Sequence, residues 1–150
     1  MESMTAELLR IGAAAFTHTD YKPGTVRHIV LFRYRQDVDA ETRAEVRQRF
    51  HALKSLSRRD GKPYIVALES GRQSSGEGAD FGFEDAFLLT FKSQGDRNYY
   101  VGTPVVTDSA YYDPDHHAFK QFVGPLLAEK GALVFDYAPK LESICLPEVR

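Results

Sequence analysis

The stretch RHIVLFRY, residues 27–34, is the part of the sequence that most strongly indicates the fold. It is rich in β-branched and aromatic residues and has charged residues near its ends, as is typical of a β-strand. Side chains alternate between the two faces of a strand, so Val30 and Phe32 point one way while Ile29 and Leu31 point the other. Both faces of this strand are therefore apolar, and each needs a covering layer.

Helix and strand patterns alternate along the rest of the chain. Asp39 can cap a helix in which Val46, Phe50 and Leu53 recur at helical spacing. A loop rich in Gly and Ser at residues 71–82 has neither helical nor strand periodicity. The predicted elements are a strand at 27–34, a helix from Asp39 that ends before residue 60, strands at 64–68 and 83–91, a short helix at 93–101, a helix that opens at Asp113-Pro114, and a strand at 132–137.

The order β-α-β-β-α-β is that of an α+β fold, the ferredoxin-like split βαβ unit. Its helices cover one face of a four-stranded antiparallel sheet. The other face stays open, although the predicted strands are apolar on both sides. A second copy of the chain would cover that face economically, so we expect a symmetric homodimer. Part of the N-terminal segment is the alternative cover.

Composition limits the classes of partner and cofactor. The 150 residues, 43% of them hydrophobic, suit a single domain that needs neither disulfides nor metal for its core. The formal net charge of −2 gives no electrostatic reason to expect nucleic acid or an anionic membrane as a partner. The loop at 71–82 lacks the phosphate-binding Gly-Lys-Ser/Thr ending and the dinucleotide fingerprint, so no nucleotide cofactor is expected.

Residues 1–24 precede the first predicted strand and form an N-terminal extension. Their apolar patch contains Arg10 and follows Glu2 and Glu7, whereas an export signal has a basic start and a longer apolar run. The single cysteine, Cys145, can form no internal disulfide, which suits a reducing compartment. We therefore expect a cytoplasmic protein without a membrane span, whose extension forms a short helix packed on its own body or on a partner's.

The start of the final predicted helix places two adjacent histidines differently. Asp113 suits the N-cap, and Pro114 suits the first helical position, where its missing amide donor is not needed. Successive helix residues are about 100° apart, which puts His116 at the edge of the apolar stripe and points His117 away from it. The same divergence keeps Asp113, Asp115 and the two histidines from converging on one ion, so we expect no metal.

His116 therefore has the most suggestive environment for chemistry. The positive end of the helix dipole opposes the imidazolium, although Asp113 and Asp115 counter this effect. A neutral imidazole accepts a proton, so His116 suits a general base for enolisation followed by aldol closure or elimination. The alternative is structural: His116 hydrogen-bonds a neighbouring group and completes the cap, and His28 is a satisfied polar group inside its strand.

Four segments together resemble the Dabb family, the stress-responsive dimeric A/B barrel domain. They are residues 28–32, 82–91, 113–116 and 133–137. The resemblance covers residues 25–140 as one domain and leaves the extension at 1–24 and a C-terminal tail at 141–150 outside it. It implies a homodimeric α/β barrel built from two ferredoxin-like subunits, and it names no reaction.

Some members of this family resemble olivetolic acid cyclase, a plant polyketide cyclase, and the resemblance to them implies site residues. It places catalytic histidines at His116 and His28. The cyclase tyrosine falls at Ala110, so Tyr111 and Tyr112 next to it are the candidate assisting tyrosines. The candidate substrate-binding residues are Asp85, which stands where the cyclases have a further cavity histidine, together with Phe87, Tyr99 and Phe119.

These observations leave three functions open. The first is a cofactor-free cyclase or lyase acting on a polyketide-like or other carbonyl compound, with His116 as general base and His28 or a tyrosine assisting. The second is a non-catalytic stress-responsive or ligand-binding homodimer, whose ligand is a small apolar or aromatic molecule. The third follows the wider dimeric α/β barrel superfamily, which includes haem-binding and monooxygenase members.

Overall fold

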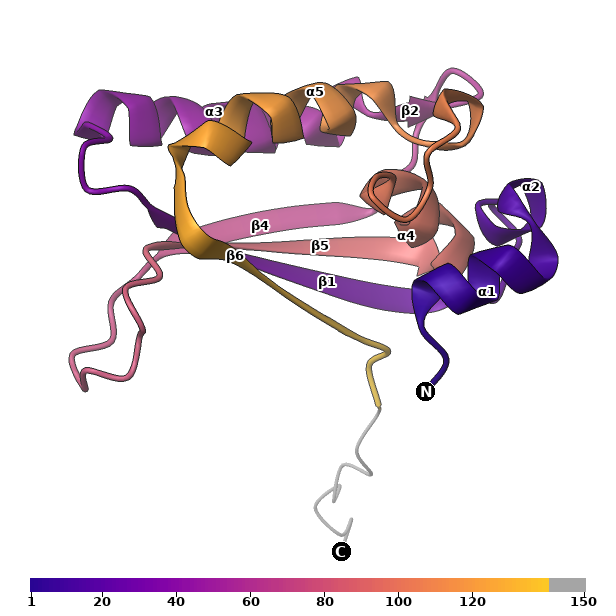
Figure 1. Cartoon of the computed structure of the whole chain (residues 1–150), viewed down its shortest axis with the longest axis horizontal. Helices are drawn as coiled ribbons and strands as arrows, with labels where there is room; N and C mark the ends of the chain where they lie inside the picture. Colours follow the sequence, from indigo (N-terminus) through magenta and orange to yellow (C-terminus); the bar gives the residue numbers. More distant parts are fainter. Residues whose placement is uncertain (141–150) are drawn as a thin grey trace, which may run out of the picture.

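A four-stranded antiparallel sheet in the order β4-β5-β1-β6 forms the centre of the computed structural model, which describes residues 1–140 (Figure 1). The strands are β1 (Pro23–Tyr34), β4 (Ala67–Arg72), β5 (Asp85–Ser93) and β6 (Leu127–Tyr137). Two further short strands, β2 (Arg58–Arg59) and β3 (Lys62–Pro63), form a separate hairpin. The predicted α+β ferredoxin-like fold is confirmed; the predicted tail at 141–150 and Cys145 lie outside the described residues.

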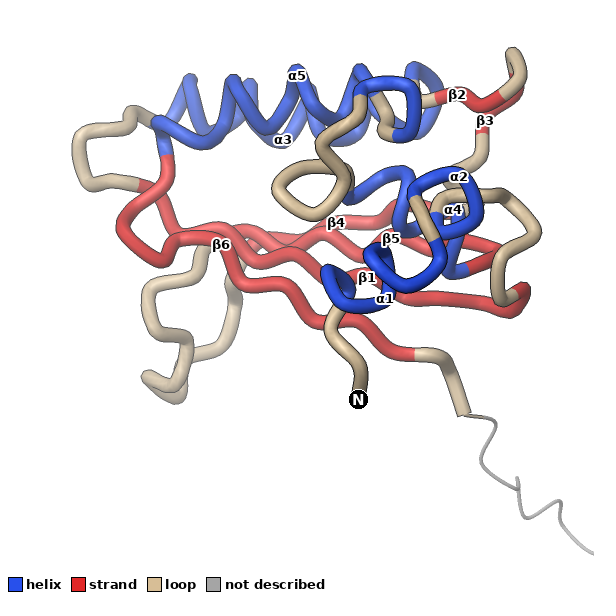
Figure 2. The backbone as a smooth tube through the Cα atoms, turned by 45° about the vertical axis from the view of Figure 1, so that its right-hand side comes forward, coloured by secondary structure: helices blue, strands red, loops and turns tan. Residues whose placement is uncertain are grey.

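Helices cover one face of this sheet. The two long helices α3 (Ala40–Leu56) and α5 (Pro114–Val123) lie side by side above it, and α4 (Gln94–Val101) lies on the same side near one end (Figures 1 and 2). Two 3-10 turns, η1 (Ser109–Tyr111) and η2 (Gly124–Leu126), flank α5. No helix among residues 1–140 has the length and apolarity needed to cross a membrane.

Alternate side chains of β1 point into the core. Along β1, the residues that are buried beneath the helices are Val26, His28, Val30, Phe32 and Tyr34. On β5, Phe87, Leu89 and Phe91 are fully buried. The ring of Phe50 from α3 stacks on that of Phe87, with centroids 3.9 Å apart. The core is therefore an aromatic layer between the sheet and the helices.

The opposite face of the sheet has no cover from the described residues. Ile29 on β1 pairs with Leu88 on β5 and with Phe135 on β6. Three large side chains of β6 on this face are exposed, namely Leu133, Phe135 and Tyr137, and Phe135 is 59% exposed. The N-terminal segment does not provide the cover, since its helices lie at the end of the sheet beside α4 (Figure 1).

The N-terminal extension forms two short helices, α1 (Met4–Ile11) and α2 (Ala13–Phe16), and packs on the body of its own chain. Phe16 is fully buried, and its carbonyl oxygen accepts a hydrogen bond of 2.8 Å from the Asn98 side chain. Gly95 in α4 lies against the backbone of His18, where a Cβ atom would stand only 1.7 Å from the His18 oxygen. The absence of a side chain at Gly95 is what lets the extension dock.

The strand boundaries differ from those predicted: β1 begins four residues earlier, β5 lies two residues later, and the second and last strands differ for reasons that the structure shows. The second strand was expected at residues 64–68, but β4 begins at Ala67, because Tyr64 and Ile65 enter the core from the connection before the strand. β4 is an edge strand with mostly exposed side chains, so it carries little hydrophobic pattern. β6 begins at Leu127, five residues earlier than predicted, and includes an irregularity in its register with β1.

Candidate functional site

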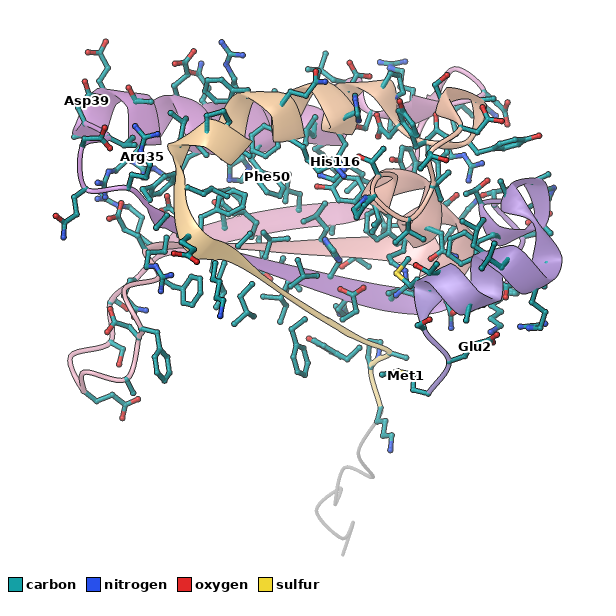
Figure 3. The ribbon with its side chains drawn as sticks, viewed as in Figure 1. Met1, Glu2, Arg35, Asp39, Phe50 and His116 are labelled. Carbon is teal, nitrogen blue, oxygen red and sulfur yellow. The ribbon has the colours of Figure 1, made fainter. Side chains whose placement is uncertain are left out.

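The first turn of α5 fixes the position of His116. The Asp113 carboxylate caps the helix by accepting hydrogen bonds from the backbone amides of Asp115, at 2.9 Å, and of His116, at 3.2 Å. Its other oxygen accepts a hydrogen bond from the hydroxyl of Tyr64. Pro114 occupies the first turn, as the sequence predicted. His116 is consequently held beneath α5, between the helix layer and the sheet (Figure 3).

The imidazole of His116 lies on the ring of Tyr100 and is bound by the backbone of the same residue. The ring centroids are 3.7 Å apart with an angle of 11° between the planes. Nδ1 of His116 is 2.5 Å from the Tyr100 carbonyl oxygen. A carbonyl only accepts hydrogen bonds, so Nδ1 carries the proton and Nε2 keeps its lone pair. Nδ1 is the only side-chain atom of His116 with a hydrogen bond among residues 1–140, so Nε2 has no partner there.

Burial determines the protonation state of His116. With 8% of its surface exposed, desolvation lowers the pKa of the imidazole to about 3, an effect to which the nearby Lys120 charge adds. The hydrogen bond to Tyr100 acts in the opposite direction and is outweighed. The sequence left open whether the helix dipole or the nearby acids determine the charge of this ring; burial is the main cause of the lowered pKa, which favours the neutral form.

His28 belongs to a second polar group beside Tyr100. Its Nδ1 is 2.6 Å from the Asp136 carboxylate, whose other oxygen accepts a hydrogen bond of 3.0 Å from Arg97. Burial alone would raise the pKa of Asp136, but His28 and Arg97 together hold it below its usual value. The His28 ring meets Tyr100 edge to face, with centroids 5.6 Å apart. Tyr100 therefore contacts both predicted catalytic histidines.

An apolar pocket of about 470 Å³ opens between the sheet and α5, and both histidines line it. It has the size and the apolar character of a small-molecule site with a few polar groups. Met4 from the N-terminal extension and Lys120 from α5 also line it. Most of the remaining lining residues are apolar, including Val30, Phe32, Phe50, Val101, Pro104, Phe119, Val123, Leu127, Ala132 and Val134.

The structure brings three of the eight predicted site residues together at this pocket, namely His116, His28 and Phe119. The two candidate tyrosines do not line it. Tyr111 ends the η1 turn, and Tyr112 stacks on the outward-facing His117 with centroids 4.8 Å apart. The Asp113 cap turns the chain at this point, which separates these tyrosines from the pocket wall.

The other three predicted site residues also lie outside the pocket. Phe87 is a core residue beneath Phe50. The Asp85 carboxylate accepts hydrogen bonds from the Tyr34 hydroxyl, at 2.7 Å, and from Arg47, at 3.1 Å. Tyr99 lies against the Arg59 guanidinium and the ring of Tyr64. The residues around these side chains explain their positions without a ligand.

Sequence reasoning missed four residues that shape the site. Tyr100 directly follows the candidate Tyr99, and no sequence signal indicates which of the two tyrosines contacts the histidines. Asp136 is the cross-strand partner of His28, so it could have been found only once the register of β1 and β6 was known. Lys120 follows His116 by four residues, the spacing that places two side chains on one helix face. Met4 comes from the extension, where no pattern indicated a contact with the pocket.

A metal site does not emerge from these side chains. Within residues 1–140 there is no group of three or more His, Cys, Asp or Glu side chains placed to hold an ion. The polar side chains that line the pocket are instead the neutral imidazole of His116, the His28–Asp136 pair, Thr103 and the Lys120 ammonium.

Solved structures with the same fold come from plants and bacteria. The protein At3g17210 from Arabidopsis thaliana is 24% identical with a TM-score of 0.63, and the match covers 79% of this chain and 99% of that one. A hydroxynitrile lyase from Passiflora edulis is 21% identical with a TM-score of 0.61, covering 83% and 99%. A dimeric ferredoxin-like protein of unknown function from Jannaschia sp. CCS1 is 17% identical with a TM-score of 0.56, covering 77% and 100%.

A search of curated protein sequences finds no significant match to this chain. The sequence pattern of the stress-responsive A/B barrel domain does match, over residues 26–139. These residues contain the whole sheet except the first three residues of β1, both long helices and both histidines of the pocket. The chain belongs to the stress-responsive A/B barrel domain family, Dabb.

Proposed function

We propose that the pocket binds a small apolar compound that carries a carbonyl group, and that His116 acts as a general base on it. The observation that carries the proposal is the state of the His116 ring. Its Nδ1 donates to a backbone carbonyl, which leaves the unprotonated Nε2 without a hydrogen-bond partner among residues 1–140 in an apolar pocket. A base in this state is ready to accept a proton from a bound molecule.

The reaction starts with proton abstraction from the carbon next to the carbonyl. The C–H bond breaks, the proton moves to Nε2 of His116, and the electron pair forms the C=C bond of an enolate with the charge on oxygen. The enolate then attacks a second carbonyl of the same molecule, as in an aldol cyclisation, or expels a leaving group, as in an elimination. The proton then moves from Nε2 to the alkoxide oxygen formed in the cyclisation, or to the leaving group in the elimination, and His116 returns to its neutral form.

His28 supports this chemistry as the second polar group of the pocket. Nδ1 of His28 donates a hydrogen bond to the Asp136 carboxylate, which fixes the orientation of the ring in the pocket. Arg97 in turn binds Asp136 and keeps it ionised. We assign to His28 a hydrogen bond to a polar group of the ligand. The hydroxynitrile lyase of Passiflora edulis shares the fold, and its activity is in keeping with lyase chemistry on this scaffold.

Hydrogen–deuterium exchange into a simple ketone tests the proposal without knowledge of the true substrate. Octan-2-one is incubated in D₂O with the protein, and deuterium at the two carbons beside the carbonyl is followed by NMR. We expect exchange above the buffer rate with the wild type, loss of that excess with His116→Ala, and its retention with the control His117→Ala. Equal exchange with wild type and His116→Ala would remove His116 as the base.

The non-catalytic alternative is supported by a different observation. Tyr100 contacts both histidines, which resembles a packed core as much as a reactive site. In that case octan-2-one would bind, seen as a raised melting temperature, while no exchange above the buffer rate occurs. The two measurements together separate an enzyme from a ligand-binding protein.

We further propose that a second copy of the chain covers the open face of the sheet. The exposed apolar side chains Leu133, Phe135 and Tyr137 support this proposal, because a monomer would leave them in water. Structures that share the fold are described as dimeric. The pocket lies on the helix side of the same sheet. The proposed ligand site and the proposed dimer interface therefore use opposite faces of the sheet.

A further inference from the structure

Among the described residues that line the pocket, Lys120 is the one whose charge has no opposite charge within ion-pair distance. It follows His116 by four residues on α5, so the two side chains share a helix face, and both line the pocket. Its Nζ donates a hydrogen bond of 2.7 Å to the carbonyl oxygen of Val101 and a second bond to that of Thr103. Val101 and Thr103 line the same pocket, so the ammonium belongs to the pocket wall.

Three other partly buried cations of the described residues have a carboxylate partner, whereas Arg27 binds the Thr90 hydroxyl and Arg33 binds backbone carbonyls. Arg47 pairs with Asp85 at 3.1 Å, Arg59 with Asp96 at 2.8 Å, and Arg97 with Asp136 at 3.0 Å. Lys120 has no such partner within ion-pair distance in the part of the chain that the structure describes. A charge that is partly removed from water is ordinarily paired. The half-buried Lys120 is therefore without an anionic partner among residues 1–140.

The hydrogen-bonding capacity of the ammonium points in the same direction. An ammonium group has three N–H donors, and two of them are used by the carbonyls of Val101 and Thr103. These two bonds fix the position of the nitrogen and leave one donor for a ligand. A fixed donor with a full charge in an apolar pocket binds an anionic oxygen more strongly than a neutral one.

We propose that Lys120 is the anion-binding group of the pocket, and that the ligand is an apolar molecule whose oxygen carries a negative charge, as in an enolate or a carboxylate. This inference rests on the proposed function and names the substrate class for it. The oxygen lies at Lys120, the neighbouring carbon faces Nε2 of His116, and the apolar remainder fills the space beneath α5.

Lys120 also supplies the positive charge that stabilises the enolate formed when His116 removes a proton. Burial and the Lys120 charge both make His116 a weak base, so the neutral ring removes a proton from carbon only if the resulting negative charge is stabilised. The enolate forms with its oxygen on the ammonium, and no proton leaves Lys120 in the step. The two residues then divide the work, since one receives the proton and the other binds the oxyanion.

Calorimetric titration with a matched pair of ligands tests the assignment. Octanoate presents a carboxylate that mimics an enolate oxygen, and octan-1-ol presents the same chain without charge. We expect the wild type to bind octanoate at least about tenfold more tightly than octan-1-ol. Lys120→Met should lose this preference and keep its affinity for octan-1-ol, and Lys120→Arg should keep the preference. Lys62→Met, in the exposed β2–β3 hairpin, is the control and should behave as the wild type.

The outcomes separate this inference from the proposed function. If octan-1-ol binds and the preference for octanoate is absent, or survives in Lys120→Met, the assignment of Lys120 is wrong while the pocket remains a ligand site. If neither ligand binds the wild type, the pocket is not a ligand site, and both proposals are overturned. Binding of octan-1-ol by Lys120→Met also shows that the variant has kept its folded pocket.

Discussion

The imidazole of His116 stacks face to face on the phenol ring of Tyr100, and its Nδ1 binds the carbonyl oxygen of the same residue. One residue thus fixes both the plane of the imidazole and its tautomer. Tyr100 is itself 1% exposed, and burial raises the pKa of its hydroxyl well above the usual value. The buried tyrosine is a rigid neutral platform, and the neutral histidine on it presents Nε2 to the pocket.

The lowered pKa of His116 predicts a pH dependence of stability. The ring titrates near pH 6.5 in the unfolded chain and near 3 in the folded one, so in this window the unfolded state binds the extra proton. The free energy of unfolding therefore falls as the pH is lowered through the window, with a slope of up to about 1.4 kcal/mol per pH unit from this group.

Urea unfolding of the wild type and of His116→Phe at several pH values isolates this contribution. Phenylalanine keeps the aromatic ring in the pocket but does not titrate. We expect the stability of the wild type to fall relative to the variant as the pH decreases from neutral towards 4, because other groups titrate equally in both. Parallel curves would show that His116 takes up its proton in the folded state at an ordinary pH.

Asp136→Asn should destabilise the protein at neutral pH. The substitution removes the charge that binds both His28 and Arg97 and leaves these two groups beneath the surface with a neutral partner. The expected loss is about 1–3 kcal/mol in the free energy of unfolding, measured with urea. Because the folded-state pKa of Asp136 is lowered, its stabilisation is present at neutral pH and disappears as the pH falls through that pKa.

The matched control for this prediction is Asp37→Asn. Asp37 forms an ion pair of 2.7 Å with Arg35, but its side chain is 68% exposed. Exposed pairs contribute little, so the loss should stay below about 1 kcal/mol. A loss at Asp136 no larger than that at Asp37 would contradict the description of the His28–Asp136–Arg97 group as a partly buried network.

The local parts of the fold and site could be predicted from the sequence. Alternation along residues 27–34 identified the face that carries His28, and the Asp113-Pro114 pair identified the start of α5 with His116 turned inward. These features depend on residues close together in the chain. The position of β4 was predicted too early in the chain. Tyr64 and Ile65 are buried although they lie outside the strand, so the apolar pattern there does not mark the strand itself.

The parts that depend on distant residues could not be predicted. Asp136 reaches His28 through strand pairing, and the Lys120 ammonium reaches the carbonyl of Thr103 in the irregular segment after α4. Tyr112 shows the opposite error, since a position next to the helix start suggested the pocket while the ring stacks on His117. Proximity in sequence did not determine the direction of that side chain.

Phe135→Asp should weaken self-association if two copies meet at the open face of the sheet. The side chain is 59% exposed on β6 and lies beside Tyr137, so its replacement removes little from the core of one copy. A carboxylate there would be buried unpaired in the dimer. Light scattering at micromolar concentration should give a dimer mass for the wild type and a monomer mass for the variant. A monomeric wild type would contradict the proposed partner.

Gly95→Ala should destabilise the protein, although glycine-to-alanine changes in helices ordinarily stabilise by about 0.5–1 kcal/mol. The added Cβ would stand 1.7 Å from the His18 carbonyl oxygen, which is backbone and has no rotamer by which to move away. The clash falls between the N-terminal extension and α4, so we expect the extension to separate and Met4 to leave the pocket wall.

The expected loss is about 1–3 kcal/mol in the free energy of unfolding by urea, accompanied by faster amide hydrogen exchange in residues 4–22. Gly76→Ala is the control, because no atom lies within 4 Å of its added Cβ, and it should change stability by less than about 0.5 kcal/mol. Since the helix-propensity effect and the docking effect have opposite signs, a stabilised Gly95→Ala protein would show that the extension does not rest on α4.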